Sequence, residues 1–168
     1  MKEILLSFCF ISAALFSSFG QNKKAEKDSL GRVQFEKAAA AMQAKDFVII
    51  VDSYETGGGS FESNTDEANF LSYEKEFVFL QGQIIAPNSF TNKLTVSEET
   101  QTTDKKGNIR MILQVRGSFV NAKIEIFLKK GSNYADVILT PTKGDVKRFS
   151  GEVIPRNESK YFKRSGGV

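Results

Sequence analysis

The chain has 168 residues, with 23 Lys and Arg against 20 Asp and Glu, a single cysteine and no histidine. It therefore lacks the side chains that most often serve as zinc or copper ligands, general bases and thiol nucleophiles. A net charge of +3 is too small to indicate nucleic-acid binding. We expect no cofactor, no metal site and no nucleic-acid partner.

The N-terminus has the pattern of a secretory signal peptide. Residues 4–19 form an apolar run without charge, and Ser18 and Gly20 supply the small residues that cleavage requires. We expect a cut between Gly20 and Gln21 and a mature protein in the periplasm or outside the cell. A retained membrane anchor is the alternative. A spanning helix needs about 20 apolar residues, so we expect no transmembrane segment after cleavage.

The one cysteine lies inside the apolar run of the leader. Cys9 follows the bulky Phe8, whereas a lipidated cysteine follows a small residue at the end of a leader. Lipid anchoring is therefore not expected. Removal of 20 residues from 168 leaves 148, which is enough for one domain with its own core. This mature chain has no cysteine, so disulfides and thiol chemistry are excluded.

One helix is predicted near the start of the mature chain. Residues 21–28 are polar and rich in lysine, which we interpret as a flexible spacer. From Ser29 to Lys45, apolar residues recur at helical spacing and include an alanine run, residues 38–41. Because the apolar face is modest, we expect this helix to pack against a sheet or to plug one end of it.

Strand signals then recur at intervals typical of an all-β sandwich or barrel. The first is a run of β-branched and aromatic residues at 47–54, and others lie around 69–73, 77–81, 94–102 and 147–154. We predict a single β-rich domain over residues 29–163 and a disordered tail over residues 164–168.

The clearest pattern lies between residues 108 and 140. Apolar and polar residues alternate there with period two over three consecutive runs, which predicts an antiparallel meander of three strands. We place its first turn at residues 117–118. That turn would pair Ile112 with Lys123 across the first two strands.

Three apolar residues break this alternation, one on each strand of the meander. Ile112, Phe127 and Ile138 place apolar side chains on the face that should meet water, which predicts a small outer apolar patch. We favour the interpretation that the N-terminal helix or a terminal segment covers this patch. The alternative is that a partner docks there.

No catalytic site is predicted. Ser72 and Lys75 match the Ser-x-x-Lys pattern of penicillin-recognising enzymes, but they lie at a predicted hairpin rather than on a helix, so we attribute the match to chance. Carboxylates along the glycine-rich loop could in principle bind calcium. They lack the order of a dedicated calcium loop, and we interpret them as a solvated acidic loop. These residues are Asp52, Glu55, Glu62, Asp66 and Glu67.

Several short motifs, taken in their order, carry a family resemblance. They follow a leader and an alanine-rich helix, and they are residues 47–52 (FVIIVD), 69–70 (NF), 105–108 (KKGN), 130–135 (KGSNYA) and 149–155 (FSGEVIP). The chain resembles a family of small exported proteins of Gram-negative bacteria known as domain of unknown function 4251. The resemblance implies an antiparallel lipocalin-like barrel or half-barrel of about seven to eight strands, with the helix against it. It implies no activity, ligand or catalytic residue. Many relatives look like lipoproteins, a pattern from which the position of Cys9 departs.

Two functional classes remain. The preferred one is a non-catalytic envelope protein that binds a small apolar or amphipathic ligand at the mouth of its barrel, or a protein partner. The alternative is a hydrolase or isomerase that uses carboxylate and lysine chemistry, for which the sequence offers no credible pair.

Overall fold

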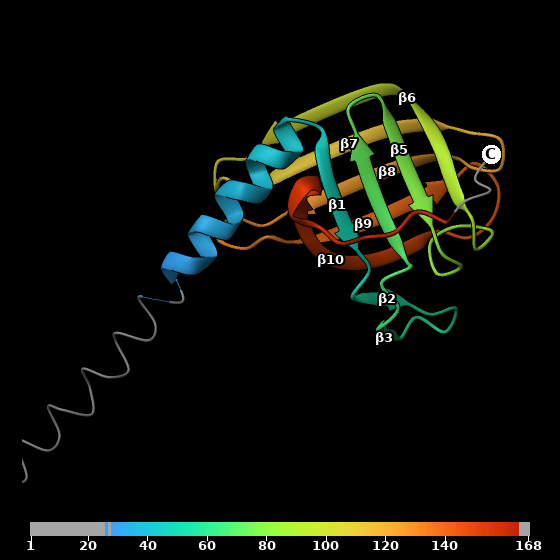
Figure 1. The fold of residues 1–168 in the computed structure, drawn as a ribbon, viewed down its shortest axis with the longest axis horizontal. Helices are drawn as coiled ribbons and strands as arrows, with labels where there is room; N and C mark the ends of the chain where they lie inside the picture. The colour runs from blue at the N-terminus through green and yellow to red at the C-terminus, as the bar shows by residue number, and fades with distance from the viewer. Residues whose placement is uncertain (1–25, 27, 165–168) are drawn as a thin grey trace, which may run out of the picture.

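The computed structural model describes residues 26 and 28–164 (Figure 1). The predicted signal peptide, with Cys9 and the expected cleavage position, lies outside these residues. The helix covers residues 28–43, and residue 26 is also helical, so it begins within the stretch that we interpreted as a spacer. Within the described ranges, no helix has the length and apolar character needed to cross a membrane.

The described part of the chain contains one 10-stranded sheet. Its strands are β1 (Asp46–Ile50), β2 (Ser53–Glu55), β3 (Phe61–Ser63), β4 (Phe70–Glu74), β5 (Phe77–Gln81), β6 (Thr91–Thr103), β7 (Ile109–Arg116), β8 (Asn121–Leu128), β9 (Tyr134–Pro141) and β10 (Lys147–Pro155). A short 3-10 helix, η1 (Arg156–Glu158), follows β10.

The sheet closes into a barrel. Its strand order runs from β1 through β4 to β10, and β10 also pairs with β1. Closure gives an eight-stranded antiparallel barrel. The strands β2 and β3 form a short hairpin, in which β2 pairs with the first half of β10. The predicted fold class, mainly β with one N-terminal helix, is confirmed.

The first predicted strand is interrupted. We predicted one strand over residues 47–54, but β1 ends at Ile50 and the chain then leaves the barrel to form β2. The reason is that β10 changes partner. Its second half pairs with β1, whereas Phe149 and Ser150 in its first half pair with β2. Asp52 N donates to Ser150 O at 2.9 Å, which satisfies the backbone at the corner.

The meander is confirmed as β7, β8 and β9, but the predicted register between its first two strands is wrong. Gly117 N donates to Val120 O at 2.8 Å and closes a longer loop than the predicted turn. Ile112 therefore lies opposite Glu125, not Lys123. Because this is a slip of two positions, every side chain stays on its predicted face.

Apolar side chains fill the interior of the barrel. Each barrel strand contributes inward residues that are almost fully buried, among them Phe47, Ile49, Leu71, Tyr73, Val78, Leu80, Leu94, Met111, Leu113, Ile124, Ile126, Val137, Phe149 and Val153. The N-terminal helix packs against one end of this core through Ala38, Ala41 and Met42. Figure 1 shows the helix at that end of the barrel. We call this the helix end and the opposite end the open end.

The last described residues, 159–164, form a segment without regular secondary structure that crosses the outside of β4, β5 and β6. We call it the C-terminal strap. The ring of Tyr161 packs edge-on against Phe70, with 4.9 Å between the ring centroids. At the far end Arg164 N donates to Gln81 Oε1 at 2.7 Å. Arg164, which we assigned to the predicted tail, is thus hydrogen-bonded to the barrel.

Glu74 is the polar anchor of the strap. Its carboxylate accepts hydrogen bonds from Tyr161 Oη at 2.7 Å and from Lys163 Nζ at 2.8 Å, and a third from Ser72. Partial burial acts to raise the pKa of Glu74, but the bonds from Lys163, Tyr161 and Ser72 together hold the pKa below its usual value. The charged form of Glu74 is therefore the one that fixes the strap.

Acid should weaken the strap. Because the pKa of Glu74 is lower in the folded protein, its contribution to stability is complete above the unfolded pKa, and it falls away as the pH drops through the folded pKa. We expect the free energy of unfolding, measured by urea titration between about pH 7 and pH 3, to fall more steeply for the wild type than for Glu74→Gln. Exposed Glu76, in the same turn, gives the control Glu76→Gln, whose slope should match the wild type. Equal slopes for wild type and Glu74→Gln would contradict this assignment.

Candidate functional site

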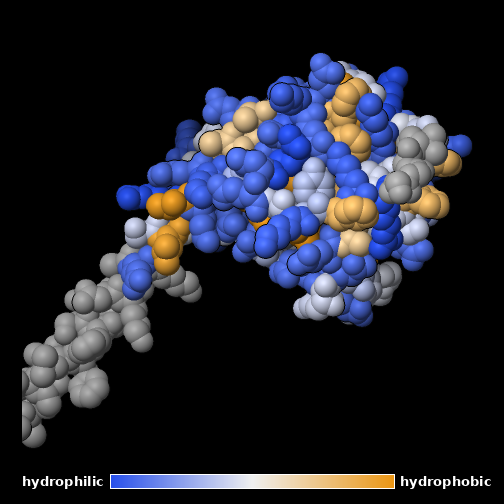
Figure 2. Space-filling view, in the orientation of Figure 1, coloured by the Kyte–Doolittle hydropathy of each residue, from blue (hydrophilic) through white to orange (hydrophobic). Residues whose placement is uncertain are grey.

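The predicted outer patch is exposed. Phe127 is 39% and Ile138 37% exposed, and Ile112 is half-buried. We had favoured cover by the N-terminal helix or a terminal segment. Among the described residues neither provides it, because the helix packs against the end of the barrel and residues 159–164 contact β4, β5 and β6. On the face drawn in Figure 2, apolar surface residues lie in small groups separated by polar ones.

Charge interrupts this patch. Glu125 lies between Ile112 and Ile138 in the sheet register, since it pairs with both. Its carboxylate forms ion pairs with Lys123, at 2.7 Å, and with Arg110. Hydrogen bonds from these two residues lower the pKa of Glu125 and keep it ionised. The three apolar residues therefore surround an ion-pair network instead of forming one continuous apolar surface.

The acidic side chains of the glycine-rich region mostly pair with other groups. Asp52 accepts a hydrogen bond from Tyr134 Oη at 2.7 Å, and Glu55 forms an ion pair with Arg148 at 2.7 Å. Among residues 26 and 28–164, no three His, Cys, Asp or Glu side chains are grouped so that they could hold a metal ion. Ser72, in the Ser-x-x-Lys match, donates to Glu74 at 2.8 Å, which places its hydroxyl in the strap contact.

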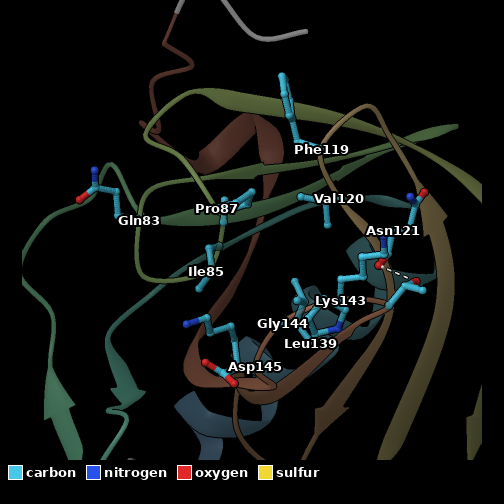
Figure 3. A pocket seen from close by; sticks show the side chains of 14 residues that line it. Gln83, Ile85, Pro87, Phe119, Val120, Asn121, Leu139, Lys143, Gly144 and Asp145 are labelled. Carbon is cyan, nitrogen blue, oxygen red and sulfur yellow. Dashed lines mark hydrogen bonds between the residues drawn. The ribbon is translucent and has the colours of Figure 1, made fainter.

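A cavity lies at the open end of the barrel. Its volume is about 490 Å³, and its walls come from the β5–β6, β7–β8 and β9–β10 connections (Figure 3). In that view Ile85 and Pro87 lie on one side, Val120 and Asn121 lie across from them, and Lys143, Gly144 and Asp145 lie below. The lining residues are Gln83, Ile85, Ala86, Pro87, Phe119, Val120, Asn121, Leu139, Pro141, Thr142, Lys143, Gly144, Asp145 and Lys147.

The β5–β6 connection folds inward because of Gly82. This residue has φ +97°, and a Cβ at its position would lie 2.1 Å from Asn69 Oδ1, so a side chain would be strained and would clash. The carbonyl of Gly82 accepts hydrogen bonds from the backbone N–H groups of Ile85 and Ala86. The resulting tight turn buries Ile85 to 2% exposure and makes it part of the cavity wall.

The strap and the rim turns fix the walls of the cavity. Arg164 donates from its guanidinium to Ser89 O at 3.2 Å, so the C-terminal strap holds the β5–β6 connection from outside. On the other side, Thr142 Oγ1 donates to Asn121 O at 3.0 Å and ties the β9–β10 turn to the start of β8. Hydrogen bonds thus attach two of the three walls to their neighbours.

The cavity has an apolar floor and a charged rim. Leu139 and Val120 are 2% and 5% exposed and form the floor together with Ile85. The titratable side chains that line the cavity are Lys143, Asp145 and Lys147. Such an arrangement can hold an apolar body against the floor and a polar group at the rim.

Sequence reasoning predicted a binding mouth but missed its residues. The connections at 82–92 and 141–145 were treated only as separators between strands, and Val120 and Lys147 were assigned to strands. Two signals could have located the site. In an antiparallel meander, alternate connections lie at the same end, so these segments must meet. The run of Ile84, Ile85 and Ala86 within a connection is also unusually apolar for a loop.

These features define the protein as a closed eight-stranded antiparallel barrel, packed inside, with a helix at one end and a lined cavity at the other. It is similar to the crystal structure of a DUF4251 family protein from Bacteroides eggerthii DSM 20697. The two chains are 27% identical with a TM-score of 0.68, over 79% of this chain and 94% of that chain. This similarity confirms the family resemblance indicated by the motifs. The chain matches no protein-family model and no curated protein.

Proposed function

We propose that the protein is a non-catalytic binding module that takes a small apolar or amphipathic ligand into the cavity at its open end. The observation that carries the proposal is a cavity of about 490 Å³ with a buried apolar floor and polar groups only at its rim. Its volume lies within the range of about 300–1,000 Å³ that is usual for small-molecule sites.

The filled interior limits where a ligand can bind. Residues such as Met111, Leu113 and Ile124 leave no exposed surface inside the barrel, so the ligand rests on the core instead of entering it. The rim lysine and carboxylate at residues 143 and 145 are exposed on a turn, and catalytic groups usually need a desolvated setting. We therefore propose a binding role rather than hydrolase or isomerase activity.

We place this binding after export. The support is the signal-peptide pattern of residues 1–20, which lies outside the described structure. The proposed setting is the periplasm or the cell exterior, with lipid anchoring of Cys9 disfavoured by its position inside the leader.

A protein partner at the outer patch is the second candidate. It is favoured by the exposure of Phe127 and Ile138 on neighbouring strands. The charged Glu125 between Ile112 and Ile138 counts against a purely apolar interface there.

A neutral, environment-sensitive apolar dye can distinguish the two surfaces. Val120→Phe adds bulk to the cavity and Ile138→Lys places a charge on the patch. We expect Val120→Phe to weaken dye binding at least tenfold, because the ring occupies the space above the floor. Ile138→Lys should leave the dissociation constant unchanged. Fluorescence titration measures both constants, and thermal unfolding confirms that each variant is folded.

The opposite pattern, in which only Ile138→Lys reduces binding, would move the site to the outer patch. A wild-type protein that binds no apolar dye at all would contradict the proposed cavity function.

A further inference from the structure

Lys147 occupies an unusual position at the open end. Along β10, inward-facing positions alternate as Phe149 and Val153, both almost fully buried, and Lys147 continues that inward row toward the cavity. It pairs across the sheet with Leu139, which belongs to the floor. A position that carries apolar residues elsewhere in the barrel therefore carries an ammonium group above an apolar floor.

No carboxylate of the described chain lies within ion-pair distance of this lysine. The ion pairs formed among residues 28–164 do not include Lys147, nor do they include Lys143 or Asp145. Because two lysines and one aspartate line the cavity, its rim carries a net positive charge. An ammonium group beside low-dielectric walls attracts anions more strongly than one in bulk water does.

We propose that the ligand is a single-chain amphipathic monoanion, a carboxylate with an unbranched apolar chain. Its chain lies on the floor formed by Ile85, Val120 and Leu139, and its head group meets Lys147 and then Lys143. This inference rests on the proposed function, which supplies the apolar site. It adds the sign of the charge and the position of the head group.

Size and charge both favour this chemistry. A cavity of about 490 Å³ suits one drug-sized molecule, which favours one chain over a two-chain lipid. A cationic amphiphile would place its charge beside two lysines, which is unfavourable. A neutral chain would bind the floor but would leave the inward ammonium without a partner.

Calorimetric titration with three probes that carry a ten-carbon chain, each kept below its micelle concentration or solubility limit, tests the proposal. The probes are decanoate, 1-decanol and decyltrimethylammonium. We expect decanoate to bind about tenfold or more tightly than the cation, as expected for a charge-assisted hydrogen bond. Lys147→Gln and Lys143→Gln together should remove this preference, and they should weaken decanoate binding much more than 1-decanol binding. Asp145→Asn should strengthen decanoate binding, because it removes the one negative charge of the rim.

The matched control changes two lysines in turns at the helix end. Lys105→Gln with Lys129→Gln alters the net charge by the same amount, and both residues are exposed. This control should bind decanoate like the wild type. If this control weakens decanoate binding as much as the Lys147 and Lys143 changes do, the preference reflects net charge and the proposed head-group site is wrong. If 1-decanol binds but decanoate binds no tighter than the cation, the charge inference fails while the cavity function stands. If neither decanoate nor 1-decanol binds, the cavity function itself fails.

Discussion

Replacing Gly151 by alanine should destabilise the barrel by about 3 kcal/mol or more, because the new methyl group has nowhere to go. A Cβ at Gly151 would lie 1.9 Å from Ile50 O, a backbone atom that no rotamer change can move. Gly151 is an inward position of β10, between the half that pairs with β2 and the half that pairs with β1. The absent side chain lets the end of β1 approach at this corner.

The control for this change is Gly57→Ala. A Cβ at Gly57 would meet nothing within 4 Å, so its free energy of unfolding should stay within about 0.5 kcal/mol of the wild type. Urea unfolding followed by circular dichroism measures both variants. If Gly151→Ala proves as stable as Gly57→Ala, the β1–β10 approach does not depend on glycine.

Replacing Tyr73 by alanine should destabilise the protein by about 3–5 kcal/mol, as for other buried aromatic residues. Tyr73 is 1% exposed and packs edge-on against Phe47, with 6.0 Å between ring centroids. Its hydroxyl donates to Glu99 Oε2 at 2.6 Å, and the same oxygen pairs with Lys45 Nζ at 2.7 Å. Burial and the bond to Glu99 raise the pKa of Tyr73, so the hydroxyl remains a neutral donor.

Tyrosine-to-phenylalanine changes separate packing from hydrogen bonding. Tyr73→Phe keeps the ring and should cost only about 1–2 kcal/mol. Tyr54 also donates to a glutamate, Glu62, at 3.1 Å, but on the exposed β2–β3 hairpin. Tyr54→Phe should therefore change the free energy of unfolding by less than about 0.5 kcal/mol. Equal effects of the two changes, measured by thermal and urea unfolding, would show that burial does not strengthen the Tyr73–Glu99 bond.

Local patterns predicted most of the fold. The alternation between residues 108 and 140 indicated β7, β8 and β9 with the correct inward faces, because side chains of a strand alternate wherever one face is buried. The register of the first hairpin was harder. Loop length sets the register, and Gly117 is compatible with more than one loop.

Contacts between distant segments decided the features that local patterns did not predict. The run at residues 47–54 looks like one strand, and its break after Ile50 depends on β10, which is about 100 residues away and offers two partners in turn. The outer patch remains exposed because the helix packs on the barrel end, a choice between two apolar surfaces that helical periodicity does not specify.

The sequence by itself determined most of the strands, the inward faces of the meander, the helix and the lack of histidine, because these follow from residue type and short-range period. Barrel closure, the partner change of β10 and the cavity arise only in the tertiary structure. The cavity brings together residues from the β5–β6, β7–β8 and β9–β10 connections, which lie far apart in the sequence. The inward direction of Lys147 follows from strand parity, but its place beside an apolar floor depends on the loop that buries Ile85 across the open end.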